Sequence, residues 1–179
     1  MAIEMDIIEF ALQMELDGRA FYTKGAETTS QPALKEIFTT LAAEEDRHYK
    51  FFKEMADGNT KKAGSLLGST AYEAMKHSKN LFEQMADLGI ESLSGDDEIE
   101  LWNEALKMEE QAEQLYRDEA TGEGDPARKK LLHSIADEEK SHIYLIDNIL
   151  TFLKDPDGYA RSKAFQSFMS WEGNTPEDW

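Results

Sequence analysis

The sequence of 179 residues contains no cysteine. This absence excludes disulfides, thiolate chemistry, cysteine-ligated zinc and cysteine-ligated iron centres from the sequence. The sequence also lacks any apolar run that approaches the length of a membrane span. The first residues are acidic, whereas a secretion signal begins with basic residues. We therefore expect a cytoplasmic protein.

Basic residues are few: 19 lysines and arginines stand against 37 aspartates and glutamates, which gives a net charge of −18. Such a charge repels nucleic acid and anionic membranes and attracts cations. We therefore expect neither nucleic acid nor a membrane as a partner. The acidic residues are spread along the chain rather than gathered in a tail, which is typical of a solubilising surface.

Apolar residues recur at helical spacing through the first part of the chain, and two polar residues interrupt the pattern. The apolar positions are Leu34, Phe38, Leu41, Phe52 and Met55. Glu45 and His48 occupy the two positions where the spacing demands Leu or Ile. The pattern therefore predicts a carboxylate and an imidazole in the core of a helical bundle.

The same arrangement recurs 94 residues further along the chain. Glu139 and His142 interrupt a second helical pattern, formed by Leu132, Ile135, Ile146 and Ile149. The offset also extends to the preceding segments, where it relates Glu15 to Glu109 and Tyr22 to Tyr116. This internal repeat predicts two similar helical hairpins.

The number of residues between each glutamate and its turn places the four glutamates at the same height along the bundle. Glu15 and Glu45 are equally far from Ser30, and Glu109 and Glu139 are equally far from Gly124. Because buried carboxylates are costly without compensation, we expect these groups to bind metal. Glu-x-x-His motifs that project into a bundle form di-iron sites in other proteins. The alternative is that the polar groups pair with one another or with buried water.

The turn signals predict an all-α fold, a four-helix bundle of two repeated hairpins with a long crossover connection and a short C-terminal helix. We expect the bundle over residues 1–155 and the C-terminal helix and tail over 156–179. The hairpins are predicted over 3–58 and 96–154, and the connection over 59–95. Within the connection, 61–65 has loop character, and Thr70 opens a helix that continues to about residue 88. The last helix is predicted over 159–171.

These motifs resemble the ferritin-like di-iron carboxylate superfamily, and most closely its rubrerythrin-like branch. The resemblance spans about residues 3–153. It implies two iron ions, with Glu45 and Glu139 bridging them. It further implies that Glu15 and Glu109 are terminal ligands and that His48 and His142 each bind one ion. Four carboxylates neutralise two divalent cations, and their oxygens with imidazole suit iron or manganese, although zinc also fits such a site.

Several neighbouring residues have candidate roles around these ligands. Tyr22 and Tyr116 are candidate hydrogen-bond donors to the ligands, as tyrosines are in the family, or aromatic residues that fill the core. Glu44 and Glu138 lie four residues before their histidines and are interpreted as flanking acids. Glu113 is interpreted as a partner for Arg19, its counterpart in the repeat, and the alternative is that Glu113 substitutes for a glutamate ligand that the family carries at the position of Ala112. Rubrerythrins carry a further glutamate at the position of Ala112, so the resemblance is incomplete there.

The resemblance implies a di-iron protein that reduces hydrogen peroxide or dioxygen in oxidative-stress defence. Because the sequence lacks cysteine, we expect a separate electron-donor protein or stoichiometric turnover. One alternative is ferroxidation and iron storage, and another is a non-catalytic bundle that holds zinc or manganese. Relatives of this branch form dimers, so we expect a homodimer, with helix exchange allowed by the connection 59–95.

Overall fold

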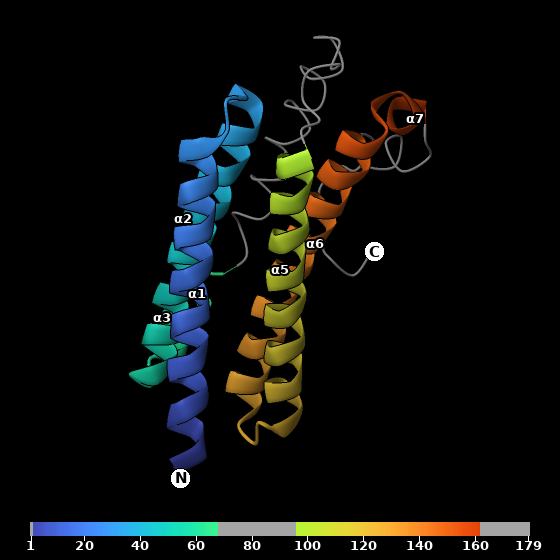
Figure 1. The fold of residues 1–179 in the computed structure, drawn as a ribbon. Coiled ribbons are helices and arrows are strands. Elements are labelled where there is room, and N and C mark those ends of the chain that lie inside the picture. Colours follow the sequence, from blue (N-terminus) through green and yellow to red (C-terminus); the bar gives the residue numbers. More distant parts are fainter. Residues whose placement is uncertain (1, 68–95, 162–179) are drawn as a thin grey trace.

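The computed structural model describes residues 2–67 and 96–161, in which every regular element is a helix. Helices α1 (Ala2–Thr28) and α2 (Pro32–Ala56) form one antiparallel hairpin, and α5 (Asp96–Gly122) and α6 (Pro126–Lys154) form the other (Figure 1). Each hairpin packs mainly on itself, while α1 also contacts α5 and α2 contacts α6. The predicted all-α bundle of two hairpins is confirmed.

Local sequence signals explain where the long helices begin and end. Pro32 and Pro126 occupy the first turns of α2 and α6, where no backbone donor is needed. The Asp125 carboxylate caps α6 by accepting hydrogen bonds from the backbone N–H groups of Ala127 and Arg128, at 2.8 and 2.9 Å. After α2, Gly58 takes a φ of +75°, a left-handed conformation that favours glycine.

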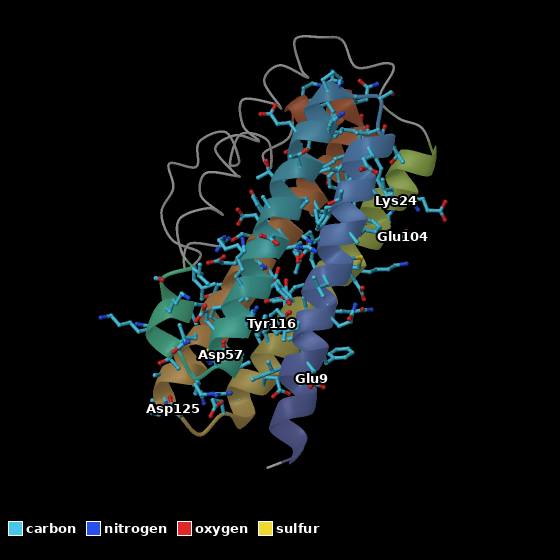
Figure 2. The ribbon with its side chains drawn as sticks, turned by 90° about the vertical axis from the view of Figure 1, so that its left-hand side faces the viewer. Glu9, Lys24, Asp57, Glu104, Tyr116 and Asp125 are labelled. Carbon is cyan, nitrogen blue, oxygen red and sulfur yellow. The ribbon has the colours of Figure 1, made fainter. Side chains whose placement is uncertain are left out.

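The apolar core is divided into two clusters by a polar layer. One cluster includes Phe38 and Leu41 from α2 with Leu145 from α6, and the other includes Phe52 from α2 with Ile135 from α6. Along α2 and α6, the glutamates and histidines of the two motifs lie between these clusters. In Figure 2, Tyr116 lies inside the bundle, whereas the side chain of Lys24 projects away from it.

Two short helices differ from the sequence-based expectation. Residues 61–65 were predicted as a loop, but Thr60–Gly64 forms helix α3. The segment is helical because fully buried Ala63 packs in the second apolar cluster, a tertiary contact that outweighs weak local propensity. Helix α7 (Pro156–Arg161) begins earlier than the predicted 159 and is anchored by a hydrogen bond of 2.7 Å from Tyr159 to Asn148 on α6.

Other expectations fall outside the described residues. These are the helix predicted from Thr70 to about residue 88, most of the 59–95 connection, and the tail beyond residue 161. Within residues 2–67 and 96–161, none of the helices combines the length and the apolar character that crossing a membrane requires.

Candidate metal centre

Six polar side chains from four helices meet in the layer between the two apolar clusters. Each residue is at most 5% exposed, so the groups are shielded from bulk water. They are Glu15 from α1, Glu45 and His48 from α2, Glu109 from α5, and Glu139 and His142 from α6. The structure thus brings together all six residues that the repeat singled out.

Glu139 lies between the two histidines. Its Oε1 is 2.9 Å from Nδ1 of His48, and its Oε2 is 3.2 Å from Nδ1 of His142. The two imidazole rings are stacked with their centroids 5.4 Å apart. One carboxylate therefore faces both halves of the cluster, with one oxygen toward each histidine.

The donor atoms form three groups, each within a span of 4.8 Å. Two of them overlap at Glu45: one consists of Glu45, Glu109, Glu139 and His142, and the other of Glu15, Glu45 and His48. The third joins Glu44 to His48 and His142. Glu45 belongs to both of the first two groups, and Glu139 contacts both histidines. Two overlapping groups that share carboxylates are the arrangement in which two neighbouring cations are held by bridging ligands.

The buried atoms in this layer fit a metal better than a closed hydrogen-bond network. Buried polar atoms in folded proteins nearly always have hydrogen-bond partners. Here the side-chain atoms that make no hydrogen bond include Glu45 Oε1, His48 Nδ1 and both carboxylate oxygens of Glu139. They lie close together, with Glu139 Oε1 2.9 Å from His48 Nδ1, an arrangement that suits donors around a cation. The donor set of carboxylate oxygen and imidazole nitrogen matches a hard or borderline divalent metal.

The electrostatics of the cluster lead to the same interpretation. Burial raises the pKa of Glu45 well above its usual range, and the nearby Glu109 and Glu15 carboxylates raise it further. Burial alone would lower the pKa of His142, but the Glu109 carboxylate outweighs this effect and raises it to about 10. Without metal, the cluster therefore holds extra protons that compensate its carboxylates. A bound cation would replace them.

Both tyrosines of the repeat contact a glutamate of the opposite hairpin. Tyr22 on α1 donates a hydrogen bond to Oε1 of Glu109 on α5, and Tyr116 on α5 donates one to Oε1 of Glu15 on α1. Burial raises the pKa of both phenols well above its usual value, and the neighbouring carboxylates add to this effect. The tyrosines therefore remain neutral donors that hold the two glutamates in place.

One flanking acid lies near its own histidine as expected, and the other does not. Glu44 has a donor atom within 4.8 Å of donor atoms of His48 and His142. Glu138 was predicted to flank His142 on its own helix, but its Oε2 lies 3.1 Å from Nε2 of His48 on α2. Arg47 contacts both flanking acids: its Nη1 is 2.7 Å from Glu138 Oε2, and its Nη2 donates to Glu44. Burial would raise the pKa of Glu138, but His48 and Arg47 lower it to about 2. Both acids are less than 9% exposed, so this ion cluster is buried.

The expected pairing of Glu113 with Arg19 is wrong. Glu113 lies 2.7 Å from Arg117 on the next turn of α5, and Arg19 lies 2.7 Å from Asp46 on α2. Both are local pairings, one along a helix and one across a hairpin. Glu113 and Arg19 therefore each pair with a residue of their own hairpin rather than with each other.

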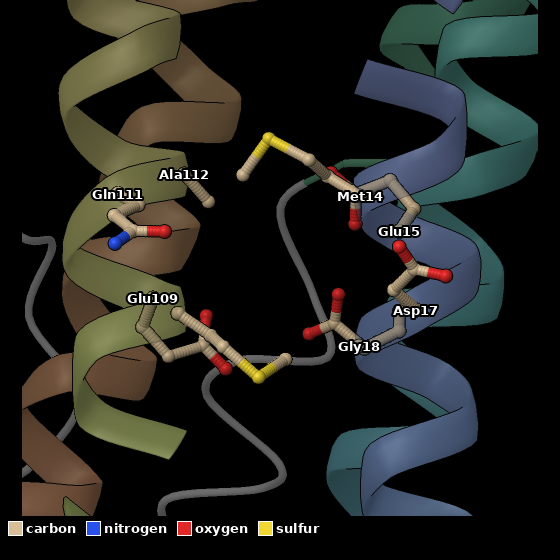
Figure 3. Close-up of a pocket in the computed structure, with 9 residues that line it drawn as sticks. Met14, Glu15, Asp17, Gly18, Glu109, Gln111 and Ala112 are labelled. Carbon is tan, nitrogen blue, oxygen red and sulfur yellow. The ribbon is translucent and has the colours of Figure 1, made fainter. Parts of the chain in front are cut away.

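A cavity of about 310 Å³ adjoins the cluster between α1 and α5 (Figure 3). Buried Glu15, Glu45 and Glu109 line its inner end, and exposed Asp17 and Gln111 line its outer part. The remaining lining residues are Met14, Gly18, Met108 and Ala112. Apart from Glu45, the lining consists of residues related in pairs by the repeat. The cavity connects the cluster to the surface.

Sequence reasoning did not assign functional roles to Arg47 or Gly18. Arg47 stands within the first Glu-x-x-His motif, and its counterpart in the second motif is Ser141. Comparing the two copies residue by residue reveals this difference in charge. Gly18 lies one turn after Glu15, and a Cβ atom there would be 2.9 Å from Oε2 of Glu45. A glycine at a core position of a helix was the available signal for that close approach.

Two helical hairpins that enclose four glutamates and two histidines place the protein in the ferritin-like class of bundles. A sequence model of the rubrerythrin family matches residues 6–150, and the chain belongs to this family. No curated protein and no solved structure matches the sequence. The family match covers both hairpins and all six clustered residues.

Proposed function

We propose that the chain binds two iron ions and uses them to reduce hydrogen peroxide. The observation that carries this proposal is the pair of overlapping donor groups in a buried layer, many of whose atoms have no hydrogen-bond partner. Membership of the rubrerythrin family supports iron as the metal.

In this proposal, each half of the cluster supplies one histidine and one terminal carboxylate. Glu15 and His48 would hold one ion, and Glu109 and His142 would hold the other. Glu45 and Glu139 would be shared between them, consistent with the contacts of Glu139 to both rings. Four carboxylates balance the charge of two divalent ions, which reduces the cost of burying either set of charges.

Two ferrous ions held there would supply two electrons, one from each ion, which is the number that reduction of a peroxide requires. The protein's own residues bring the peroxide to the site and hold the ligands there. The cavity between α1 and α5 reaches the inner carboxylates from the surface. Tyr22 and Tyr116 fix Glu109 and Glu15 by hydrogen bonds from the opposite hairpin. Burial excludes bulk water and strengthens these electrostatic contacts.

Electrons for repeated turnover come from a separate donor protein in this proposal, because the sequence has no cysteine with which to build a thiolate-ligated iron centre. The alternatives are ferroxidation with iron storage and a redox-silent metal site. Both alternatives use the same six ligands, so the identity of the metal and its reactivity distinguish them, and the arrangement of the ligands does not.

The test combines metal content with peroxide consumption. We expect about two irons per chain after anaerobic loading and rapid oxidation of this iron by hydrogen peroxide. The double variant Glu45→Ala/Glu139→Ala should lose the iron and the reaction. Glu110→Ala removes an exposed glutamate next to Glu109 and should retain both.

Other results would assign other functions. Iron that accumulates as mineral within a large assembly would favour storage. Zinc retained from the native host, with no reaction toward peroxide, would favour a structural site. Iron binding that survives the double substitution would refute the assigned ligands.

A further inference from the structure

The cavity beside the carboxylates is larger than hydrogen peroxide needs. A water molecule takes up about 30 Å³ in the liquid, and an apolar cavity of about 150 Å³ in another protein holds benzene. At about 310 Å³, this cavity has room for an organic group in addition to the solvent around a metal pair. Its size therefore allows a ligand with a carbon skeleton.

The middle of the cavity has apolar walls and little side-chain bulk. Met14 on α1 and Met108 on α5 are equivalent in the repeat and supply flexible thioether side chains, which adapt to irregular apolar ligands (Figure 3 shows Met14). Gly18 and Ala112 are likewise equivalent, and both leave the space between the helices open. Gly18 also admits Glu45 at close range, and Glu45 lines the cavity together with Glu15 and Glu109.

Charge disfavours an anionic ligand. Three carboxylates line the inner end, Asp17 stands at the outer part, and the chain as a whole carries a net charge of −18. Bound metal would neutralise the inner carboxylates, but Asp17 and the net charge of the chain would still repel an anionic ligand. No lysine or arginine lines the cavity to offset this repulsion.

We infer that the cavity binds neutral organic hydroperoxides, with the alkyl or aryl group between Met14 and Met108 and the peroxide group toward Glu15, Glu45 and Glu109. This inference rests on the proposed function and names its substrate class. In the reaction, the O–O bond of the hydroperoxide breaks with uptake of two electrons and two protons. The products are the corresponding alcohol and water, and the electrons come from the two ferrous ions, which become ferric.

The binding part of the inference can be tested without turnover. The probe is 2-phenyl-2-propanol, the alcohol formed from cumene hydroperoxide, added to the 179-residue chain labelled with ¹³C at its methionine methyl groups. We expect saturable shifts of the Met14 and Met108 signals, assigned through Met14→Leu and Met108→Leu. Met55, which is buried in an apolar cluster and does not line the cavity, should not shift.

Filling the cavity provides the matched comparison. Ala112→Leu adds a branched side chain to the lining, and we expect it to abolish the saturable shifts. Glu110→Leu places the same side chain at an exposed position outside the cavity and should leave them intact. The inference is overturned if the alcohol shifts no methionine, if it shifts Met55 equally, or if Ala112→Leu binds it as well as the unmodified chain. A thermal melt of each variant shows whether loss of binding reflects loss of folding.

Kinetics on the iron-loaded protein test the substrate class. Burial of a phenyl group predicts a KM for cumene hydroperoxide about tenfold or more below that for hydrogen peroxide. Ala112→Leu should reduce this ratio, and Glu110→Leu should not. Equal KM values for the two peroxides would overturn the inference and leave the proposed function standing. If neither peroxide is consumed by protein that holds two irons, the proposed function fails, and the binding experiment still decides what the cavity accepts.

Discussion

Arg47 on α2 and Glu138 on α6 form an ion pair across the two hairpins, with Nη1 and Oε2 2.7 Å apart. Arg47 also contacts Glu44 and donates to the backbone oxygen of Leu66 at 2.6 Å. One arginine therefore joins α2, α6 and the residues after α3. Its counterpart in the repeat is Ser141, so the contact exists on one side of the cluster only.

Removing Arg47 should destabilise the protein strongly. In Arg47→Ser, two buried carboxylates lose their cation, and breaking a buried pair in this way costs about 3 kcal/mol or more. Arg19→Ser is the control, because Arg19 and Asp46 are paired but partly exposed and should contribute about 1 kcal/mol or less. Urea unfolding of the metal-free proteins measures both values. Equal losses of unfolding free energy in the two variants would show that the pair of Arg47 and Glu138 stabilises the protein no more than an exposed pair does.

Metal affinity should rise with pH. The pKa of His142 is raised to about 10 in the metal-free cluster, so its imidazole is protonated at neutral pH and must lose that proton to bind metal. The affinity should increase up to about tenfold per pH unit for each displaced proton as the pH rises from about 6.5, and the increase from His142 should level off near pH 10. Competition with a chelator measures the affinity, and a pH indicator measures proton release.

His133→Gln provides the control for that experiment, because His133 lies on α6 outside the cluster. Its proton release should equal that of the unmodified protein. An affinity that stays constant over this range, after correction for the chelator, would contradict the prediction.

Removing the hydroxyl of either cross-hairpin tyrosine should weaken metal binding without unfolding the bundle. In Tyr22→Phe, Glu109 loses the donor that orients it, and losses of this kind cost about tenfold or more in metal affinity. Tyr116→Phe should act in the same way on Glu15. Tyr49→Phe removes a hydroxyl outside the donor groups and should have no effect. Unchanged affinity in both cluster variants would mean that the tyrosines only fill space.

Two glycines on α1 should respond in opposite ways to alanine. In Gly18→Ala, the new Cβ meets the end of the Glu45 side chain at 2.9 Å, so the carboxylate moves and metal affinity falls. The helix gains up to about 1 kcal/mol in propensity, so the metal-free protein should not lose stability. In Gly25→Ala, the Cβ meets the ring of Phe38 at 2.8 Å, and that ring is stacked on Trp102. Overpacking of this kind costs about 1 to 3 kcal/mol.

Thermal unfolding and metal titration of both variants distinguish these effects. If Gly18→Ala binds metal normally, the close approach of Gly18 to Glu45 has no role in the site. If Gly25→Ala keeps its full stability, the core around Phe38 and Trp102 is more adaptable than its packing indicates.

Helical spacing and the repeat were sufficient to predict the main features of the fold and the cluster. Glu45 and His48 replace apolar residues at regular positions, and chain length to the turn fixes their level relative to Glu15. Cap signals at Pro32 and Asp125 set the helix boundaries. These are properties of single helices and short turns, which a sequence specifies locally.

Contacts between hairpins could not be predicted in the same way. The sequence does not show that Tyr22 bonds to Glu109 rather than to a ligand of its own hairpin, or that Glu138 faces His48. Those pairings depend on how the two hairpins pack and on side-chain rotamers. The helix Thr60–Gly64 was missed for a related reason, because the burial of Ala63 against the bundle holds it in place.

Tyr22 and Tyr116 each donate a hydrogen bond to a glutamate of the other hairpin, so neither half of the chain contains a complete site. Each hairpin provides ligands and also the hydroxyl that steadies a ligand of the other. A hairpin expressed alone would contain one terminal glutamate, one Glu-x-x-His motif and a tyrosine without its acceptor. Two copies of one hairpin, related by a twofold axis, would restore the whole set. The present chain thus joins two repeat-related halves into one site, and the halves differ at positions such as Arg47 and Ser141.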